Sequence, residues 1–227
     1  MQPYFFPYLG YYQLAFHVDH FIFLDDVKLI RRGYIQRNHI LLHKSPYRFT
    51  LPIQKSSQNK NINEHFFINE HEHFLKILHS AYHNAPYFEE INSLIQRILK
   101  NNQNVAECCQ RSIIEVFSYL QHPISHSVSS AHPSDLKSQD RIIDLCKIFK
   151  AKQYYNPIGG QGLYDSATFS KNKIQLCFFN GEYPIYHQHR QSNKEPFIPK
   201  LSMIDILMNS SKEDIVHMLK MGNVAAA

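Results

Sequence analysis

The sequence predicts an α/β fold with a mixed or mostly parallel sheet and an inserted helical subdomain. Short apolar strands alternate with helical segments near both ends of the chain, which is typical of α/β proteins. The middle of the chain instead has apolar residues at helical spacing and no strand pattern. We therefore expect an α/β core made of residues 1–70 and 121–227, and a helical insert over residues 71–120.

The N-terminal part is expected to contain a helix, a strand and a hairpin. Apolar residues at helical spacing after two prolines predict a helix over residues 8–18. The aromatic run 21–24 predicts a strand that ends at two aspartates. Alternation over 40–42 and 47–53 predicts a hairpin, and the polar stretch 54–61 predicts a loop.

The rest of the chain is predicted to be helical first and α/β afterwards. Pro86 and an Asn-rich linker at 100–104 separate three helical segments, the last of which has one apolar stripe suited to a core. The predicted elements are helices over 73–82, 87–99 and 105–120, a strand over 124–130, a helix over 140–149, strands over 153–157 and 174–179, and helices over 201–208 and 212–221.

Composition limits the class of protein and of ligand. A chain of 227 residues can bury a sizeable core. The formal charge of +5 is spread along the chain rather than gathered into a basic tract, which favours an anionic small molecule over nucleic acid as the partner. No run approaches the ~18 apolar residues of a membrane span, and no signal peptide is recognisable, so we expect a cytoplasmic protein without a transmembrane segment.

The cysteines and histidines do not predict a metal centre. The four cysteines have no CxxC spacing and lie in apolar periodic segments, where free cysteine behaves as a small hydrophobic residue. The histidine pairs are expected by chance among fifteen histidines, and no third ligand accompanies them. G-x-S-x-G and H-E-x-x-H are both absent from the sequence.

The first candidate site is the end of the first strand. Ligands of α/β sheets bind outside the carboxyl ends of strands, where Asp25 and Asp26 are expected to act as a general base or to bind Mg²⁺. The alternative is that one aspartate caps a turn and the other pairs with Arg31 or Arg32. The planar guanidinium of Arg31, Arg32 or Arg37 suits phosphate or carboxylate, and one or two of these arginines are expected to neutralise the aspartates instead.

Two further segments are expected near this crevice. Gly159 and Gly160 follow a strand but match no phosphate-binding motif, so a turn is the default interpretation. Asn156 and Tyr164 are polar groups beside that turn. The run from Ser202 to Asp205 has the spacing of a capping box with Asp in place of Glu.

Several blocks of the chain, taken together, resemble one known family. They are Gln2-Pro-Tyr-Phe-Phe-Pro-Tyr-Leu-Gly-Tyr-Tyr-Gln-Leu, Leu24-Asp-Asp-Val, Arg32-Gly-Tyr-Ile-Gln-Arg-Asn38, Ala85-Pro-Tyr-Phe, Gln139-Asp-Arg-Ile-Ile-Asp-Leu-Cys, Tyr155-Asn-Pro-Ile-Gly-Gly160 and Leu201-Ser-Met-Ile-Asp-Ile-Leu-Met. This order, from residue 2 to about 208, resembles the WbqC-like family. The resemblance implies a bacterial protein of surface-polysaccharide (O-antigen, lipopolysaccharide) biosynthesis, and for some members a glycine or amino-acid transferase acting on an amino sugar.

The chain departs from the family pattern in two places. Similar proteins usually have several apolar residues before the Gln-Pro pair, a first strand of the Lys-Ile-Ala-Ile type, whereas this sequence begins on the motif. Either the crevice lacks one wall, or the natural protein is a few residues longer. After Asn209 the family tends to have glycine, and this chain has Ser210, so the local turn is expected to differ.

The leading interpretation is a transferase that moves an aminoacyl or acyl group to the amine of a sugar nucleotide or sugar lipid, with an acyl carrier protein as an expected donor partner. The expected catalytic residues are Asp25, Asp26 and Tyr164. The expected substrate-binding residues are Gln2, Tyr4, Gly10, Arg31, Arg32, Arg37, Asn38, Asn156, Gly159, Gly160, Gln188, Ser202 and Asp205. Two alternatives stay open: a non-catalytic binding subunit for a sugar nucleotide or acyl carrier, and a nucleotidyl transferase with Mg²⁺ at Asp25 and Asp26.

Overall fold

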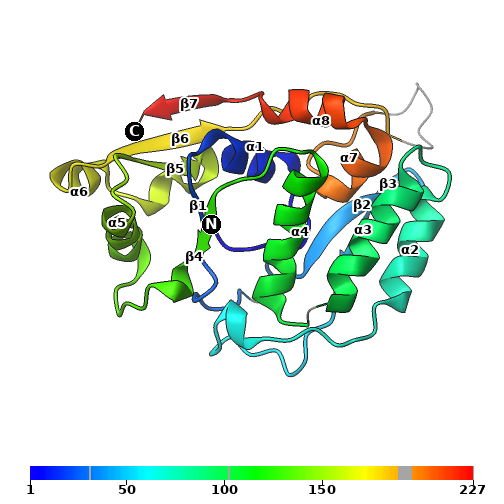
Figure 1. Cartoon of the computed structure of the whole chain (residues 1–227), viewed down its shortest axis with the longest axis horizontal. Coiled ribbons are helices and arrows are strands. Elements are labelled where there is room, and N and C mark those ends of the chain that lie inside the picture. Colours follow the sequence, from blue (N-terminus) through cyan, green and yellow to red (C-terminus); the bar gives the residue numbers. More distant parts are fainter. Residues whose placement is uncertain (31, 102, 189–195, 227) are drawn as a thin grey trace.

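Figure 1 shows the computed structural model of the chain, which describes residues 1–30, 32–101, 103–188 and 196–226. Helices and strands alternate as the sequence predicts. The elements in order are α1 (Leu9–His17), β1 (Phe21–Phe23), β2 (Arg37–Leu42), β3 (Ser45–Thr50), η1 (Ile62–Glu64), α2 (Glu72–Tyr82), α3 (Phe88–Asn101), α4 (Val105–Tyr119), β4 (His126–Val128), η2 (Ser129–Ala131), α5 (Ser138–Ile148), β5 (Gln153–Pro157), η3 (Ile158–Leu163), α6 (Ser166–Lys171), β6 (Gln175–Asn180), α7 (Met203–Asn209), α8 (Lys212–Leu219) and β7 (Asn223–Ala226).

The predicted mixed α/β class is confirmed, and the described strands are divided among small sheets. β1 pairs with β4 in parallel, β2 and β3 form the predicted antiparallel hairpin, and β5 pairs in parallel with β6. β7 adds an antiparallel edge to β6. Consequently β1 and β5 are both edge strands in the described part of the chain.

Helices occupy both ends of the molecule in Figure 1. α2, α3 and α4 lie side by side at one end, and α5 and α6 lie at the other, beyond the β1–β4 pair. The hydrophobic faces of α2, α3 and α4 pack into one large core that also includes α1, the hairpin, α7 and α8. The division into an α/β core and a helical insert stays a prediction, and the helices of the expected insert share their core with the N-terminal segment.

Three elements differ from the sequence-based expectation. α6 has six residues, too few to give a periodic signal, and its N-cap is Asp165, which accepts the Thr168 amide (3.0 Å). β7 ends in alanines, which have low β propensity, and it forms by pairing with β6. The strand expected over 124–130 stops at Val128, because Ser129 begins the turn η2.

Within the described residues, no helix combines the length and the apolar composition that crossing a membrane requires.

Candidate functional site

The carboxylate of Asp25 lies at the end of β1 and is surrounded by hydrogen-bond donors. Oδ1 accepts from the Ser129 hydroxyl (3.1 Å) and the Ser130 amide (3.0 Å), and Oδ2 accepts from the Ser130 hydroxyl (2.6 Å) and from Asn63 Nδ2 (3.4 Å). Only 5% of Asp25 is exposed. A carboxylate has about four lone-pair sites. Asp25 is therefore fully engaged, and it holds the turn η2 against β1.

Asp26 has a different environment although it is the next residue. Its Oδ2 accepts from Arg141 Nη2 (3.2 Å), and its Oδ1 shares the single hydroxyl proton of Ser129 with Asp25 Oδ1. Arg141 also donates to the carbonyls of Ser129 (2.8 Å) and His132 (2.6 Å) and to Asp144 Oδ2 (3.1 Å). The side chain of Arg141 is 7% exposed and that of Asp26 is 22% exposed. Asp26 is held from the protein side and keeps part of its carboxylate open to solvent.

The partner of Asp26 is thus Arg141 of α5, and no ion pair joins an aspartate to Arg32 among the described residues. Arg31, the other predicted neutralising arginine, lies outside the described residues. The expectation relied on sequence distance. Arg32 is close to the aspartates in the sequence, whereas Arg141 is distant in the sequence and is brought next to Asp26 by folding.

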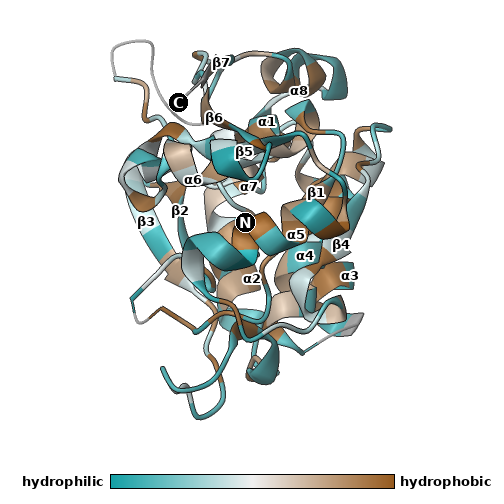
Figure 2. Cartoon of the chain, turned by 90° about the vertical axis from the view of Figure 1, so that its left-hand side faces the viewer, coloured by the Kyte–Doolittle hydropathy of each residue, from teal (hydrophilic) through white to brown (hydrophobic). Residues whose placement is uncertain are grey.

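α5 connects the ends of β1 and β5. Arg141 in its first turns holds Asp26, and Gln139 Oε1 accepts the amide of Asp165 (2.6 Å) just after the turn that follows β5. Figure 2 shows α5 facing the viewer with hydrophobic and hydrophilic residues along its length. Three of its hydrophobic residues belong to a small core of Ile142, Ile143, Cys146, Phe169, Ile174, Leu176 and Phe178, against which Leu24, Tyr154 and Tyr164 pack.

Asn156 and Tyr164, both predicted site residues, form one hydrogen-bonded group with Tyr154. The Tyr154 hydroxyl lies 3.1 Å from the Tyr164 hydroxyl and donates to Asn156 Oδ1 (3.3 Å). Asn156 Nδ2 donates to the Pro157 carbonyl (3.2 Å). A Cβ on Gly160 would lie 2.0 Å from Asn156 Nδ2, so a side chain at this position would displace the Asn156 amide. Tyr154 and Tyr164 are half-buried, and Asn156 is buried.

The two glycines of this turn differ in the space around them. A Cβ on Gly159 would meet no atom within 4 Å, so Gly159 is not required by packing. The segment forms the 3-10 turn η3, as the default interpretation of a turn expects.

Asn38 and Ser202 hold the proline-rich loop of residues 2–8. Phe6 has φ +43°, a conformation that L residues rarely adopt. Its carbonyl accepts from Asn38 Nδ2 (2.8 Å) and from the Ser202 hydroxyl (2.6 Å), and its amide donates to the Ser112 hydroxyl (3.0 Å). Three hydrogen bonds therefore hold Phe6 in this backbone conformation. The polar atoms of Asn38 and Ser202 that bind Phe6 are engaged within the protein.

The other predicted residues of this loop are used mainly through their backbone. The Gln2 carbonyl accepts from the Tyr11 hydroxyl (2.9 Å), and the Tyr4 carbonyl accepts from Ser112 (3.3 Å). The side chain of Tyr4 is half-buried, and Gly10 is buried in the first turn of α1.

Asp205 and Gln188 meet in the interior. Asp205 Oδ1 accepts from the Tyr82 hydroxyl (2.6 Å), and Oδ2 accepts from the Tyr186 hydroxyl (2.6 Å) and from Gln188 Nε2 (3.4 Å). Burial raises the pKa of Asp205, and these three donors oppose the rise. Gln188 also bonds the amide (3.0 Å) and the carbonyl (2.8 Å) of Ile198. This cluster joins α2, α7 and the segment after β6.

The capping box predicted at α7 is half formed. Ser202 is the N-cap and accepts the Ile204 amide (3.4 Å). Asp205 does not complete the box, because its two oxygens accept from the buried tyrosines.

Arg32 and Arg37 differ in burial. Arg32 is exposed and has φ +60°. Arg37 is half-buried at the start of β2, and its buried Nε has no hydrogen-bond partner in the described part of the chain. An unpaired buried donor is destabilising. Arg37 is therefore better placed than Arg32 to gain from an anionic ligand.

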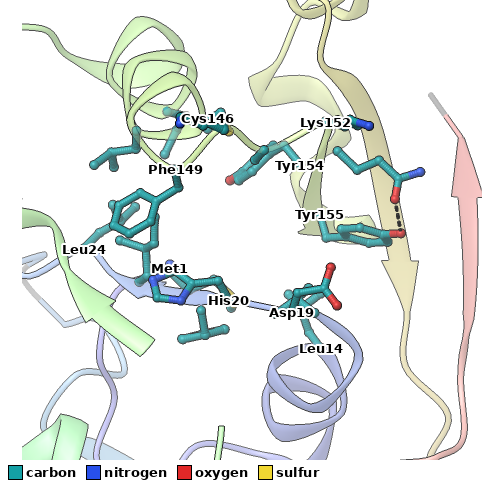
Figure 3. A pocket seen from close by; sticks show the side chains of 18 residues that line it. Met1, Leu14, Asp19, His20, Leu24, Cys146, Phe149, Lys152, Tyr154 and Tyr155 are labelled. Carbon is teal, nitrogen blue, oxygen red and sulfur yellow. Dashed lines mark hydrogen bonds between the residues drawn. The ribbon is translucent and has the colours of Figure 1, made fainter. Parts of the chain in front are cut away.

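A cavity of about 490 Å³ lies between β1 and β5 (Figure 3). α5 contributes Cys146 and, just beyond it, Phe149, while Leu14 of α1 lies on the opposite side. None of the predicted site residues lines it. The full lining is Met1, Leu14, Val18, Asp19, His20, Phe21, Ile22, Leu24, Ile142, Leu145, Cys146, Phe149, Lys150, Ala151, Lys152, Gln153, Tyr154 and Tyr155.

The edge of β1 beside this cavity is bonded to Met1 through its backbone. The Phe21 amide donates to the carbonyl of Ser125, the residue before β4, so the backbone groups of Ile22 point away from β4. The Ile22 carbonyl accepts from the Met1 amine (2.6 Å). Met1 in turn accepts from the Leu24 amide (2.8 Å), which is the parallel pattern. Burial lowers the pKa of the Met1 amine to about 5. The cavity therefore lies between two strands that are each at the edge of their sheet in the described part of the chain.

Comparison with known proteins identifies the family. The model of the WbqC-like protein family matches residues 2–217. The chain belongs to the WbqC-like family. It is also 26% identical over 223 residues to a protein of Mycobacterium tuberculosis named "Uncharacterized protein Rv1507c", an alignment that covers 94% of this chain and 93% of that protein. No solved structure matches the chain.

The carboxylates of this WbqC-like protein are a poor fit for Mg²⁺. Hydrogen-bond donors engage both oxygens of Asp25, and the guanidinium of Arg141 lies beside Asp26. Magnesium is bound by oxygen ligands and keeps several waters. No group of three or more His, Cys, Asp or Glu side chains converges among the described residues.

The cysteines of the WbqC-like chain are buried and free, as their apolar surroundings predict. Burial raises the pKa of Cys108 to about 12 and that of Cys146 to about 11. Thiols in this state are poor nucleophiles.

Sequence reasoning missed the residues that organise the strand end in this family member. Ser129, Ser130 and Arg141 serve the aspartates, and they are more than 100 positions away from them in the chain. Arg141 lies inside a family block, which was the available signal. The two serines lie in an ordinary polar segment, and only their contact with β1 distinguishes them.

Proposed function

We propose that the chain is a transferase of bacterial surface-polysaccharide biosynthesis, which moves a glycyl, other aminoacyl or acyl group onto the amine of an amino sugar. The observation that carries the proposal is the carboxylate of Asp26 at the end of β1, fixed by Arg141 and Ser129 and 22% exposed. A base fixed by its own hydrogen bonds can meet a substrate without rearranging. Membership of the WbqC-like family supports the pathway assignment.

The proposed step is acyl transfer. The neutral amine of the sugar attacks the carbonyl carbon of an activated acyl donor, such as a thioester on an acyl carrier protein. A C–N bond forms, and the bond to the leaving sulfur or oxygen breaks with its electron pair. Asp26 accepts the proton that the attacking nitrogen loses, and that proton passes to the leaving group.

Other residues have supporting roles in this proposal. Arg37, with its unpaired buried Nε, binds a phosphate of the sugar carrier together with the more exposed Arg32. Tyr164 presents its hydroxyl to the sugar or the carbonyl oxygen. Asn38, Asn156 and Asp25 act by positioning, since their side chains are engaged within the protein.

The test compares surface polysaccharide from four strains of the source bacterium. Deletion of the gene should remove an amide-linked acyl or glycyl substituent, and the intact gene should restore it. Asp26→Asn should fail to restore it. Asp144→Asn is the matched control, because Asp144 also pairs with Arg141 but is not the residue at the end of β1. Unchanged polysaccharide in the deletion strain would refute the proposal.

A second candidate is a non-catalytic subunit that binds a sugar nucleotide or an acyl carrier. It is favoured by one observation: most of the predicted polar residues are hydrogen-bonded internally, and the cysteines are buried. Calorimetry with the purified chain and a full set of substrates separates the candidates. Binding without turnover supports the subunit.

A further inference from the structure

Two tyrosines and a lysine form a polar cluster where the proline-rich loop enters α1. The rings of Tyr8 and Tyr183 lie 6.2 Å apart between centroids and are tilted by 36°. Lys200 Nζ lies 5.1 Å from the centroid of the Tyr183 ring. The two tyrosines are half-buried and the lysine is exposed. The ring therefore helps to position an ammonium group that remains accessible.

Glycine at position 10 makes this arrangement possible. A Cβ on Gly10 would lie 2.6 Å from the Tyr183 hydroxyl oxygen and 2.9 Å from Cε2 of Tyr8. Gly181 approaches the same place, since a Cβ there would lie 3.2 Å from the Cα of Gly10. Because neither Gly10 nor Gly181 has a side chain, the Tyr183 hydroxyl can lie directly over the first turn of α1.

The side-chain hydrogen-bonding groups of this cluster have no partner among the described residues. Within the described residues, neither the Tyr8 nor the Tyr183 hydroxyl has a hydrogen-bond partner, and no carboxylate forms an ion pair with Lys200. Two other tyrosines behave differently: the hydroxyls of the buried Tyr82 and the half-buried Tyr186 both donate to Asp205. Burial raises the pKa of Tyr8 and raises that of Tyr183 to about 12, so both hydroxyls remain protonated donors near neutral pH.

A second lysine of the same chain shows what a purely structural pair looks like. Lys212 Nζ lies 4.0 Å from the centroid of the Tyr119 ring, and it pairs with Glu90 Oε1 (3.3 Å). The Tyr119 hydroxyl donates to Glu90 as well (3.1 Å). In that pair the Glu90 carboxylate binds both the ammonium group and the phenol hydroxyl. At Tyr183 and Lys200 that anion is supplied by no described residue.

The cluster adjoins the strand that carries Arg37. Tyr8 forms a β-bridge with Ser202, and the Ser202 amide donates to the His39 carbonyl (2.7 Å). Arg37 lies two residues before His39 in β2, on the same face of the strand. Two cationic side chains without a described counter-ion thus lie on neighbouring segments.

We propose that Tyr8, Tyr183 and Lys200 form a phosphate-binding subsite for the sugar-phosphate substrate. Two phenol donors and one ammonium group match an anion with several oxygens. The identity of the substrate rests on the proposed function, whereas the phosphate subsite itself does not.

The test is isothermal calorimetry of the full chain with inorganic pyrophosphate at low ionic strength. Lys200→Met keeps the aliphatic stem and should weaken binding at least about 10-fold, because it removes the charge. Tyr183→Phe keeps the ring, loses one donor, and should weaken binding about 3-fold to 10-fold. Lys212→Met is the matched control and should bind as the unaltered chain does. Thermal melting of each variant checks the fold.

Each outcome decides the proposal. Absence of pyrophosphate binding by the unaltered chain overturns it, and so does equal weakening by Lys200→Met and Lys212→Met. If Asp26→Asn restores the polysaccharide while Lys200→Met loses pyrophosphate, the proposed function fails and the phosphate subsite survives. The reverse pattern refutes the subsite alone.

Discussion

The cluster around Asp205 and the outer edge of β1 differ in how completely their polar groups are hydrogen-bonded. Asp205 is fully buried, and each of its oxygens accepts from a tyrosine hydroxyl. At the edge of β1, the Met1 amine is buried with one carbonyl as its partner, and Asp26 is partly open to solvent.

The difference separates architecture from a place where something else can bind. Groups of the Asp205 cluster have no capacity left for a ligand, so their role is to join α2, α7 and the segment after β6. The outer edge of β1 bonds only to Met1 among the described residues, and it lies beside a cavity with a partly exposed carboxylate at its end. Asp205 and Asp26 were nevertheless both expected as site residues from the sequence.

Replacement of Asp205 tests the first region most severely. Asp205→Ala should lower the free energy of unfolding by about 4–5 kcal/mol, because the hydroxyls of Tyr82 and Tyr186 lose their acceptor and Gln188 loses one of its acceptors. Urea unfolding measures the change. Asp135→Ala, at an exposed position, is the control and should change stability by less than about 0.5 kcal/mol. A loss under about 1 kcal/mol for Asp205→Ala would remove the contrast between the regions.

Acetylation of the Met1 amine tests the second region. The folded-state pKa of about 5 lies below the ordinary 8.0, so the unfolded chain binds more protons between these values, and stability rises with pH across this window. Acetylation removes the charge and should stabilise by about 2–4 kcal/mol at pH 5, with the gain vanishing near pH 8. A pH-independent gain would contradict the burial of the amine.

The cavity itself sharpens this prediction. A Lys-Ile-Ala-Ile type segment joined to Met1 should stabilise the chain more than the acetyl group does, because it can also pair with the strand edges. A Gly-Ser segment of equal length is the control. Hydrogen exchange of the Ile22 and Tyr155 amides reports the pairing.

Removal of Arg141 should have a smaller effect. Arg141→Met should lower the free energy of unfolding by about 2–3 kcal/mol, since it leaves Asp26 and two buried carbonyls without their donor. Arg97→Met, which breaks an exposed pair with Glu115, should change stability by less than about 1 kcal/mol. Equal losses would show that the Arg141 network is no more than a surface ion pair.

Asp26→Asn should have the smallest effect on stability, about 1 kcal/mol or less, because the carboxylate is partly solvated and its shape is kept. Urea unfolding measures it next to the transfer assay. Lost stability comparable with that of Asp205→Ala would place Asp26 among the architectural residues.

Local pattern was sufficient for most of the elements. The helical spacing of residues 105–120 matches α4, and the alternation around the hairpin matches β2 and β3. These signals work because each element must bury one face, which leaves a period in the sequence. α6 and β7 were not predicted, because α6 is too short to show a period and β7 forms through pairing with β6.

The sequence by itself determined which segments become helices and strands, and which family blocks carry the unusual polar residues. It could not separate Asp205, which is closed by tyrosines from two distant segments, from Asp26, which is held by an arginine from α5. It also could not reveal the cavity between β1 and β5, or the lysine that lies over the ring of Tyr183. Burial and hydrogen-bond satisfaction depend on which distant segments meet, and that is a property of the folded chain alone.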